Sequence, residues 1–219
     1  MGQRHQIYVR VKEGDKKVVY GFHHQWLYGK TALKSLLRVL TFSEGEGNYN
    51  ALRDFSYQPT SDVIKSILST DWTCGYYHMV HPFQSDRFNT MDSQEEEWGQ
   101  SCIKDPREGD NNDGITIIDF TGKTPAYCFM SLLGLECDTS QLDKIEDLTP
   151  LSAEKYLTAY YPNFKSELYP DFETIDQERE HREECIDLVG ALDGYKILTL
   201  KQIQSIFPKM YADKIRKVG

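Results

Sequence analysis

Polar and aromatic side chains gather in two short runs near the beginning of the chain. The runs contain Arg4, His5, Gln6, His23, His24, Gln25, Trp26 and Tyr28. A neutral imidazole needs hydrogen-bond partners for both ring nitrogens, so three histidines on two predicted strands indicate a polar pocket. His5, His23 and His24 are the candidate catalytic residues, as acid/base groups or metal ligands, and the other members are candidate ligand-binding residues. The alternative is structural, with one histidine facing the core and the others solvated.

Basic residues follow this cluster at helical spacing. Lys30, Lys34 and Arg38 stand at i, i+4 and i+8, directly after Gly29. The free amide groups at the start of a helix attract anions. This face, together with Arg4, is therefore a candidate site for a small phosphate-bearing ligand. The alternative is an ordinary solvated lysine face.

A run rich in aspartate and asparagine is the candidate cation site. It spans 110–114 and reads Asp-Asn-Asn-Asp-Gly. Carboxylate and amide oxygens suit Ca²⁺ or Mg²⁺, which makes Asp110 and Asp113 candidate metal ligands. Either residue could also join the histidines in a site with open positions for water, so a divalent metal ion is the one cofactor suggested. The alternative is a simple turn, because such runs before glycine are ordinary turn sequences.

Two hairpins are expected to position these residues. Alternating side chains over 5–12 predict a half-buried strand, and the turn at 13–16 before the segment 18–27 predicts that it folds back on itself. This hairpin would bring His5 near His23 or His24. The segments 115–120 and 126–130, joined by a turn, predict a second hairpin.

The helices are expected mainly in the last third of the chain. Helices are predicted over 30–40, 61–68, 150–161 and 176–192, and from 199 to Pro208. The segment 72–84 is a candidate strand, and 86–113 is a candidate long loop. Because strands come first and no regular strand–helix alternation is present, the sequence predicts an α+β fold. We expect a single domain over 1–219, with 149–219 as a candidate helical lobe.

Composition excludes several classes of protein. Of the 219 residues, 39% are hydrophobic, which is enough for a core. The longest charge-free apolar stretch spans only 124–135, too short to cross a membrane. The five cysteines form no C-x-x-C pair and the N-terminal residues form no apolar run, so reduced thiols and a cytoplasmic location are expected.

The net charge of −9 is unevenly distributed. Residues 1–60 carry a net charge of +4, residues 61–193 carry −18, and residues 194–219 carry +5. The total argues against a protein that coats nucleic acid. The distribution instead predicts two surfaces, one that accepts an anion and one that faces a cationic partner.

The first 40 residues resemble a known group of proteins. The opening Met-Gly-Gln-Arg-His-Gln, followed by His-His-Gln-Trp at 23–26 and Tyr-Gly at 28–29, resembles a group of viral, phage and fungal proteins of unassigned activity. The run at 110–114 extends the resemblance. It implies an accessory protein of viral or phage type and assigns no catalytic residue.

Two functions are therefore expected, and whether the protein is an enzyme stays open. The first is an accessory protein, in the host cytoplasm if viral, that binds or inhibits a cellular protein through an acidic, tyrosine-rich surface. The acidic runs 95–97 and 178–184 would form this surface, the alternative being ordinary solvated faces. The second is a small metal-dependent hydrolase or nucleotide-binding enzyme that uses His5, His23 and His24 on a phosphate-bearing substrate.

Overall fold

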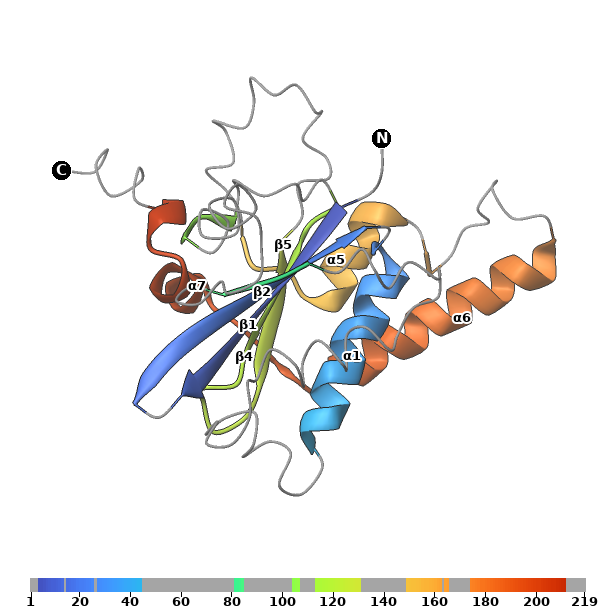
Figure 1. The fold of residues 1–219 in the computed structure, drawn as a ribbon. Helices are drawn as coiled ribbons and strands as arrows, with labels where there is room; N and C mark the ends of the chain where they lie inside the picture. The colour runs from blue at the N-terminus through green and yellow to red at the C-terminus, as the bar shows by residue number, and fades with distance from the viewer. Residues whose placement is uncertain are drawn as a thin grey trace.

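The fold combines a mixed β-sheet with helices on both of its faces (Figure 1). The computed structural model describes residues 4–13, 15–25, 27–44, 81–84, 104–106, 113–130, 149–162, 164–165 and 174–211. The strands are β1 (Arg4–Glu13), β2 (Lys16–Gln25), β3 (His81–Gln84), β4 (Ile115–Asp119), β5 (Ala126–Met130) and β6 (Lys196–Ile197). The helices are α1 (Lys30–Glu44), α5 (Ala153–Tyr160), α6 (Ile175–Leu192) and α7 (Leu200–Ile206), followed by the 3₁₀ turn η4 (Lys209–Tyr211). The expected α+β class is confirmed.

The described strands form one sheet in the order β3-β2-β1-β4-β5-β6. β1 and β2 pair antiparallel along their whole length, and β4 and β5 do the same, so both expected hairpins are confirmed. The hairpins are joined by a parallel pairing of β1 with β4, which the sequence did not predict. The sheet is therefore mixed rather than purely antiparallel.

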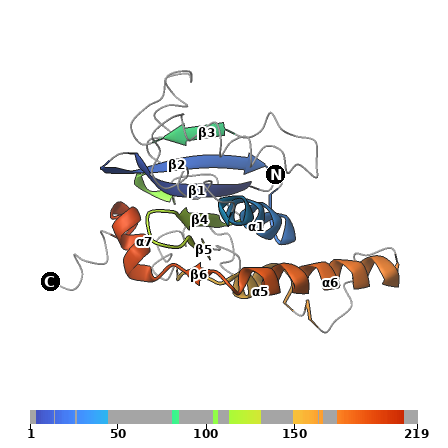
Figure 2. The same ribbon diagram turned by 90° about the horizontal axis from the view of Figure 1, so that it is seen from below.

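Helices α1, α5 and α6 lie on one face of the sheet, and α7 lies on the other (Figure 2). On the first face, Ile7 of β1 belongs to the same core cluster as Leu36 of α1, Leu157 of α5 and Cys185 of α6. In the described part of the chain, the helices of 149–219 thus share core clusters with the sheet, and α6 packs against α1 and α5. On the second face, Tyr8 belongs to a separate cluster that includes residues of α7.

This second cluster corrects the expectation that β1 is half-buried. Gln6 and Tyr8, expected on a polar face, are both 0% exposed. Alternation of polar and apolar residues predicts a solvated face only where nothing covers it. Here the apolar side chains of α7 cover that face, with Phe207 packing edge-on against Tyr8 at 5.2 Å between ring centroids.

The boundaries of the last three helices follow from their caps. The side chains of Ser152, Thr174 and Thr199 accept hydrogen bonds from backbone amides in the first turns of α5, α6 and α7. The predicted start of α5 at Pro150 is wrong by three residues. Leu151 instead forms backbone hydrogen bonds with Phe129 of β5.

Several expectations concern residues outside the described ranges. These are the helix over 61–68, most of the strand over 72–84, the loop over 86–113 apart from 104–106 and Asp113, and Asp110. Within 72–84, the four residues of β3 form the strand that the structure describes.

Candidate functional site

The first candidate residue, His5, lies in a buried hydrogen-bond network at the start of β1. Its side chain is 0% exposed. Nε2 lies 2.8 Å from the hydroxyl of Thr116 in β4, and Nδ1 lies 3.3 Å from the carbonyl oxygen of Asp113. These contacts fit one tautomer, in which Nδ1–H donates to Asp113 and Nε2 accepts from Thr116. Both ring nitrogens of His5 therefore have partners inside the protein.

Two tyrosines of α5 complete this network around Asp113. The hydroxyl of Tyr156 donates to the Asp113 carbonyl oxygen at 3.0 Å, and the hydroxyl of Tyr160 donates to the same oxygen. Tyr160 also lies 3.3 Å from the Asp113 carboxylate. Burial raises the pKa of both tyrosines well above the ordinary value, so the hydroxyls stay protonated and act as donors. The structure thus brings His5 and Asp113 together, but mainly through the backbone of Asp113.

The other candidate residues of the hairpin are divided by its register. His5 lies opposite His24, as the hairpin predicted, whereas His23 lies opposite Gln6. His24 is buried with 2% of its surface exposed, and Tyr28 is half-buried against the ring of Tyr160. The positions of the three histidines therefore do not converge on one place.

The structure describes no side chain for three further candidate binding residues, Arg4, Gln25 and Trp26. The backbones of Arg4 and Gln25 lie opposite each other at the open end of the hairpin. The side chains of Arg4, Gln25 and Trp26 are outside the described part of the chain.

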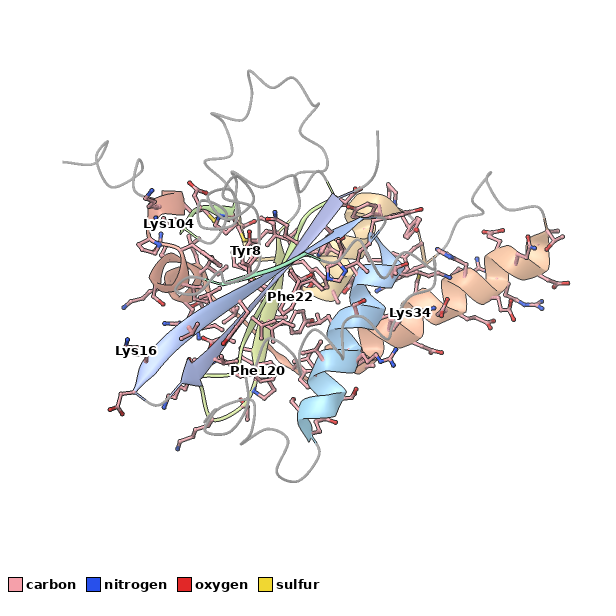
Figure 3. The ribbon with its side chains drawn as sticks, in the orientation of Figure 1. Tyr8, Lys16, Phe22, Lys34, Lys104 and Phe120 are labelled. Atoms are coloured by element: carbon pink, nitrogen blue, oxygen red, sulfur yellow. The ribbon has the colours of Figure 1, made fainter. Side chains whose placement is uncertain are left out.

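The candidate anion-binding lysines of α1 are engaged by a carboxylate of α6. The amino group of Lys30 lies 2.5 Å from Glu184, and Lys34 makes an ion pair with the other oxygen of the same carboxylate. Figure 3 shows Lys34 on the side of α1 toward α6. Burial acts to raise the pKa of Glu184, but the hydrogen bonds from both lysines outweigh it and leave the pKa below its ordinary value. Arg38 is exposed further along α1.

A hollow of about 700 Å³ opens beside this ion-pair cluster. It is lined by Lys30, Gln177, Glu180, His181, Glu183, Glu184 and Asp187. Four of these residues carry carboxylates and one carries an ammonium group, so the hollow is strongly acidic.

His181 forms the inner wall of this region and is 7% exposed. Its ring meets Tyr161 edge-on, with 4.9 Å between ring centroids. Burial, and to a lesser degree the charge of Lys30, lower the pKa of His181 to about 4 against the opposing effect of Glu184. His181 is therefore neutral at physiological pH.

The sequence did not single out His181 or Glu184 as individual residues, because α6 looked like a uniformly charged face. A helical pattern was nevertheless present. Glu178 and His181 continue, at i and i+3, the spacing of the apolar residues Cys185, Leu188 and Leu192, and all five are buried.

Within the described side chains, no three histidine, cysteine or carboxylate groups are arranged to hold a metal ion. The carbonyl oxygen of Asp113 lies against His5, and it accepts hydrogen bonds from both tyrosines, while Oδ1 of the Asp113 carboxylate accepts one from Tyr160. None of the helices in the described ranges is long and apolar enough to cross a bilayer.

Comparison of the whole chain with protein-family models, with curated proteins and with solved structures gives no match.

Proposed function

We propose that the protein acts by binding a cationic segment of a partner protein at the acidic hollow beside α6. The observation that carries this proposal is the concentration of Glu180, Glu183, Glu184 and Asp187 around a hollow of about 700 Å³. Lys30 lies in the same lining and offsets one of these charges. The remaining negative charge is available to a partner.

The carboxylates form a stripe along α6 rather than a random cluster. Asp176, Glu180, Glu183 and Asp187 are all exposed and are spaced by four, three and four residues. This spacing keeps them on one side of an α-helix over roughly 16 Å, at a rise of about 1.5 Å per residue. The stripe matches a partner segment that presents several lysines or arginines in a row.

The stripe carries a cost that a cationic partner would remove. Like charges at i and i+4, such as Glu183 with Asp187, destabilise a helix by about 0.2–0.5 kcal/mol per pair. Asp176 and Glu180 form another such pair, although Arg179 lies 2.9 Å from Asp176 and offsets part of that repulsion. A bound cationic segment would neutralise both pairs at once, so binding and helix stability would favour each other.

The acidic part of the expected surface is supported better than its tyrosine-rich part. The eight tyrosines with described side chains are buried or half-buried. They are Tyr8, Tyr20, Tyr28, Tyr127, Tyr156, Tyr160, Tyr161 and Tyr195. The proposed contact is therefore mainly electrostatic, and it would inhibit a partner whose own cationic site it occupies. The acidic run 95–97 lies outside the described residues.

The hydrolase or nucleotide-binding alternative has less support. An acid/base or metal-binding histidine must reach its substrate, but His5 and His24 are at most 2% exposed. Lys30 and Lys34 would have to give up Glu184 before they could hold a phosphate. The geometry therefore favours a binding protein.

The test uses a lysine- and arginine-rich synthetic peptide and isothermal titration calorimetry at low and high salt. The double reversal Glu183→Lys with Asp187→Lys should weaken binding at least tenfold at low salt. The matched control is Asp15→Lys with Asp193→Lys, which changes the net charge equally at exposed positions outside the hollow. Equal weakening by both double variants would show attraction to net charge alone and would overturn the proposed site.

A further inference from the structure

The carboxylate of Glu184 in α6 is shared by two lysines that stand four residues apart in α1. Oε2 accepts a hydrogen bond from Nζ of Lys30 at 2.5 Å, and Oε1 makes an ion pair with Lys34. The side chains of Lys30, Lys34 and Glu184 are 27%, 30% and 37% exposed. Each oxygen of the carboxylate therefore has its own lysine, and all three side chains remain within reach of solvent.

The two lysines differ in their position relative to the acidic hollow. In the described part of the chain, Lys30 and Glu184 both line the hollow, whereas Lys34 is not among the lining residues. The charge of Lys30 also lowers the pKa of His181, on the inner wall, more strongly than the charge of Lys34 does. Lys30 thus presents its amino group in the hollow, and Lys34 holds Glu184 from outside it.

The amino group of Lys30 is the same chemical group that a lysine of a cationic partner would bring. Its positive charge repels such a partner, and its hydrogen bond occupies Oε2 of Glu184. The contact can nevertheless be exchanged, because a partly exposed ion pair is weak and lysine has a flexible four-carbon stem. Lys30 and a cation of the partner therefore compete for the same carboxylate oxygen.

We propose that Lys30 is a built-in competitor of the cationic partner, which displaces it from Glu184 while Lys34 keeps the carboxylate in place. This inference rests on the proposed binding at the hollow and concerns the regulation of that site. A single amino group gains little by the exchange, since one ion pair replaces another. A segment with several cations gains the further contacts with Glu180, Glu183 and Asp187, so the competitor favours a polybasic segment over an isolated cation.

The experiment titrates the lysine- and arginine-rich peptide into the wild-type protein and three variants at low salt. Lys30→Met keeps most of the stem but removes the amino group, and should tighten binding by about threefold or more. The matched control Lys201→Met removes an equal charge from an exposed position of α7, on the other face of the sheet, and should change the affinity less than twofold. Lys34→Met leaves Lys30 in the hollow and should tighten binding less than Lys30→Met does.

The outcomes separate this role of Lys30 from the proposed function. A peptide that binds neither the wild type nor any variant would overturn both. Binding that depends on Glu183 and Asp187, but is equal in Lys30→Met and Lys201→Met, would overturn the competitor alone. An equal gain in Lys30→Met and Lys34→Met would overturn it as well, because the effect would then not depend on the hollow.

Displacement can also be observed directly in the wild-type protein. Nuclear magnetic resonance of isotope-labelled lysine side chains follows the two amino groups, with signals assigned from the Lys30→Met and Lys34→Met variants. Addition of the peptide should shift the Lys30 signal toward that of a solvated lysine and leave the Lys34 signal close to its starting position. A Lys30 signal unchanged at saturation would contradict the displacement. Circular dichroism should show the same fold in both variants, since partly exposed ion pairs contribute little to stability.

Discussion

Nε2 of His5 and the hydroxyl oxygen of Thr116 lie 2.8 Å apart, although 111 residues separate them in the chain. The parallel pairing of β1 with β4 brings them together, since Ile7 lies opposite Thr116 in that register. The same pairing places Asp113, just before β4, beside His5. A histidine that the sequence marks as a candidate for chemistry thus links the two hairpins of the sheet.

We expect Thr116→Val to destabilise the protein by about 1–3 kcal/mol, because it leaves a buried nitrogen of His5 without its partner. Urea denaturation followed by circular dichroism measures the change. The control Thr124→Val lies in an exposed turn and should alter the free energy of unfolding by less than about 0.5 kcal/mol. A small effect at Thr116 would show that the contact contributes little.

Tyr156→Phe and Tyr160→Phe should each cost about 1 kcal/mol, since either hydroxyl alone still satisfies the carbonyl oxygen of Asp113. The double variant should cost more than the two single variants together, because the carbonyl then keeps only the weaker contact with His5. A double-mutant cycle on the free energy of unfolding measures this coupling. Strict additivity would mean that the two hydroxyls act independently.

Gly29→Ala should destabilise the protein by roughly 2 kcal/mol. Gly29 has a φ of +51°, and a Cβ atom there would lie 3.1 Å from the ring of Tyr161. Both the left-handed backbone and the crowding oppose a side chain. The matched change Gly190→Ala, in α6 with open space around it, should instead stabilise the protein by about 0.5–1 kcal/mol. Thermal melts of both variants measure the change in stability relative to the wild type. A change of the same sign in the two variants would contradict the explanation.

Stability should fall as the pH drops from about 6.5 to about 4, partly because of His181. In that window the unfolded chain binds a proton at His181, but the folded protein does not, since burial and Lys30 lower the pKa there to about 4. The neutral form is therefore required for full stability, and the loss amounts to roughly 2–3 kcal/mol at the acidic end. His181→Gln should remove this part of the pH dependence. Denaturation curves at pH 4.5 and 7.5 for both proteins provide the measurement, and parallel pH profiles would refute the assignment.

The candidate site could be predicted only in part. The alternation of β1 and β2 predicted that His5 would lie near a histidine of the second strand, and the register pairs it with His24. The same alternation could not show that α7 covers the second face of β1 and buries Gln6. Nor could the charge pattern of α6 show that Glu184 is held by two lysines of α1.

The sequence by itself determined the local elements: the two hairpins, α1, and the helical pattern of α6. Each of these elements depends on the spacing of apolar residues and on turn residues within a short stretch of sequence. Over such a stretch, the backbone geometry of a strand or a helix requires its own spacing of apolar residues. Only the tertiary structure decided that β1 runs beside β4, that His5 contacts Thr116 and Asp113, and that the carboxylates of α6 surround a hollow. These relationships join segments more than 100 residues apart, and they depend on how whole elements bury their apolar faces against one another.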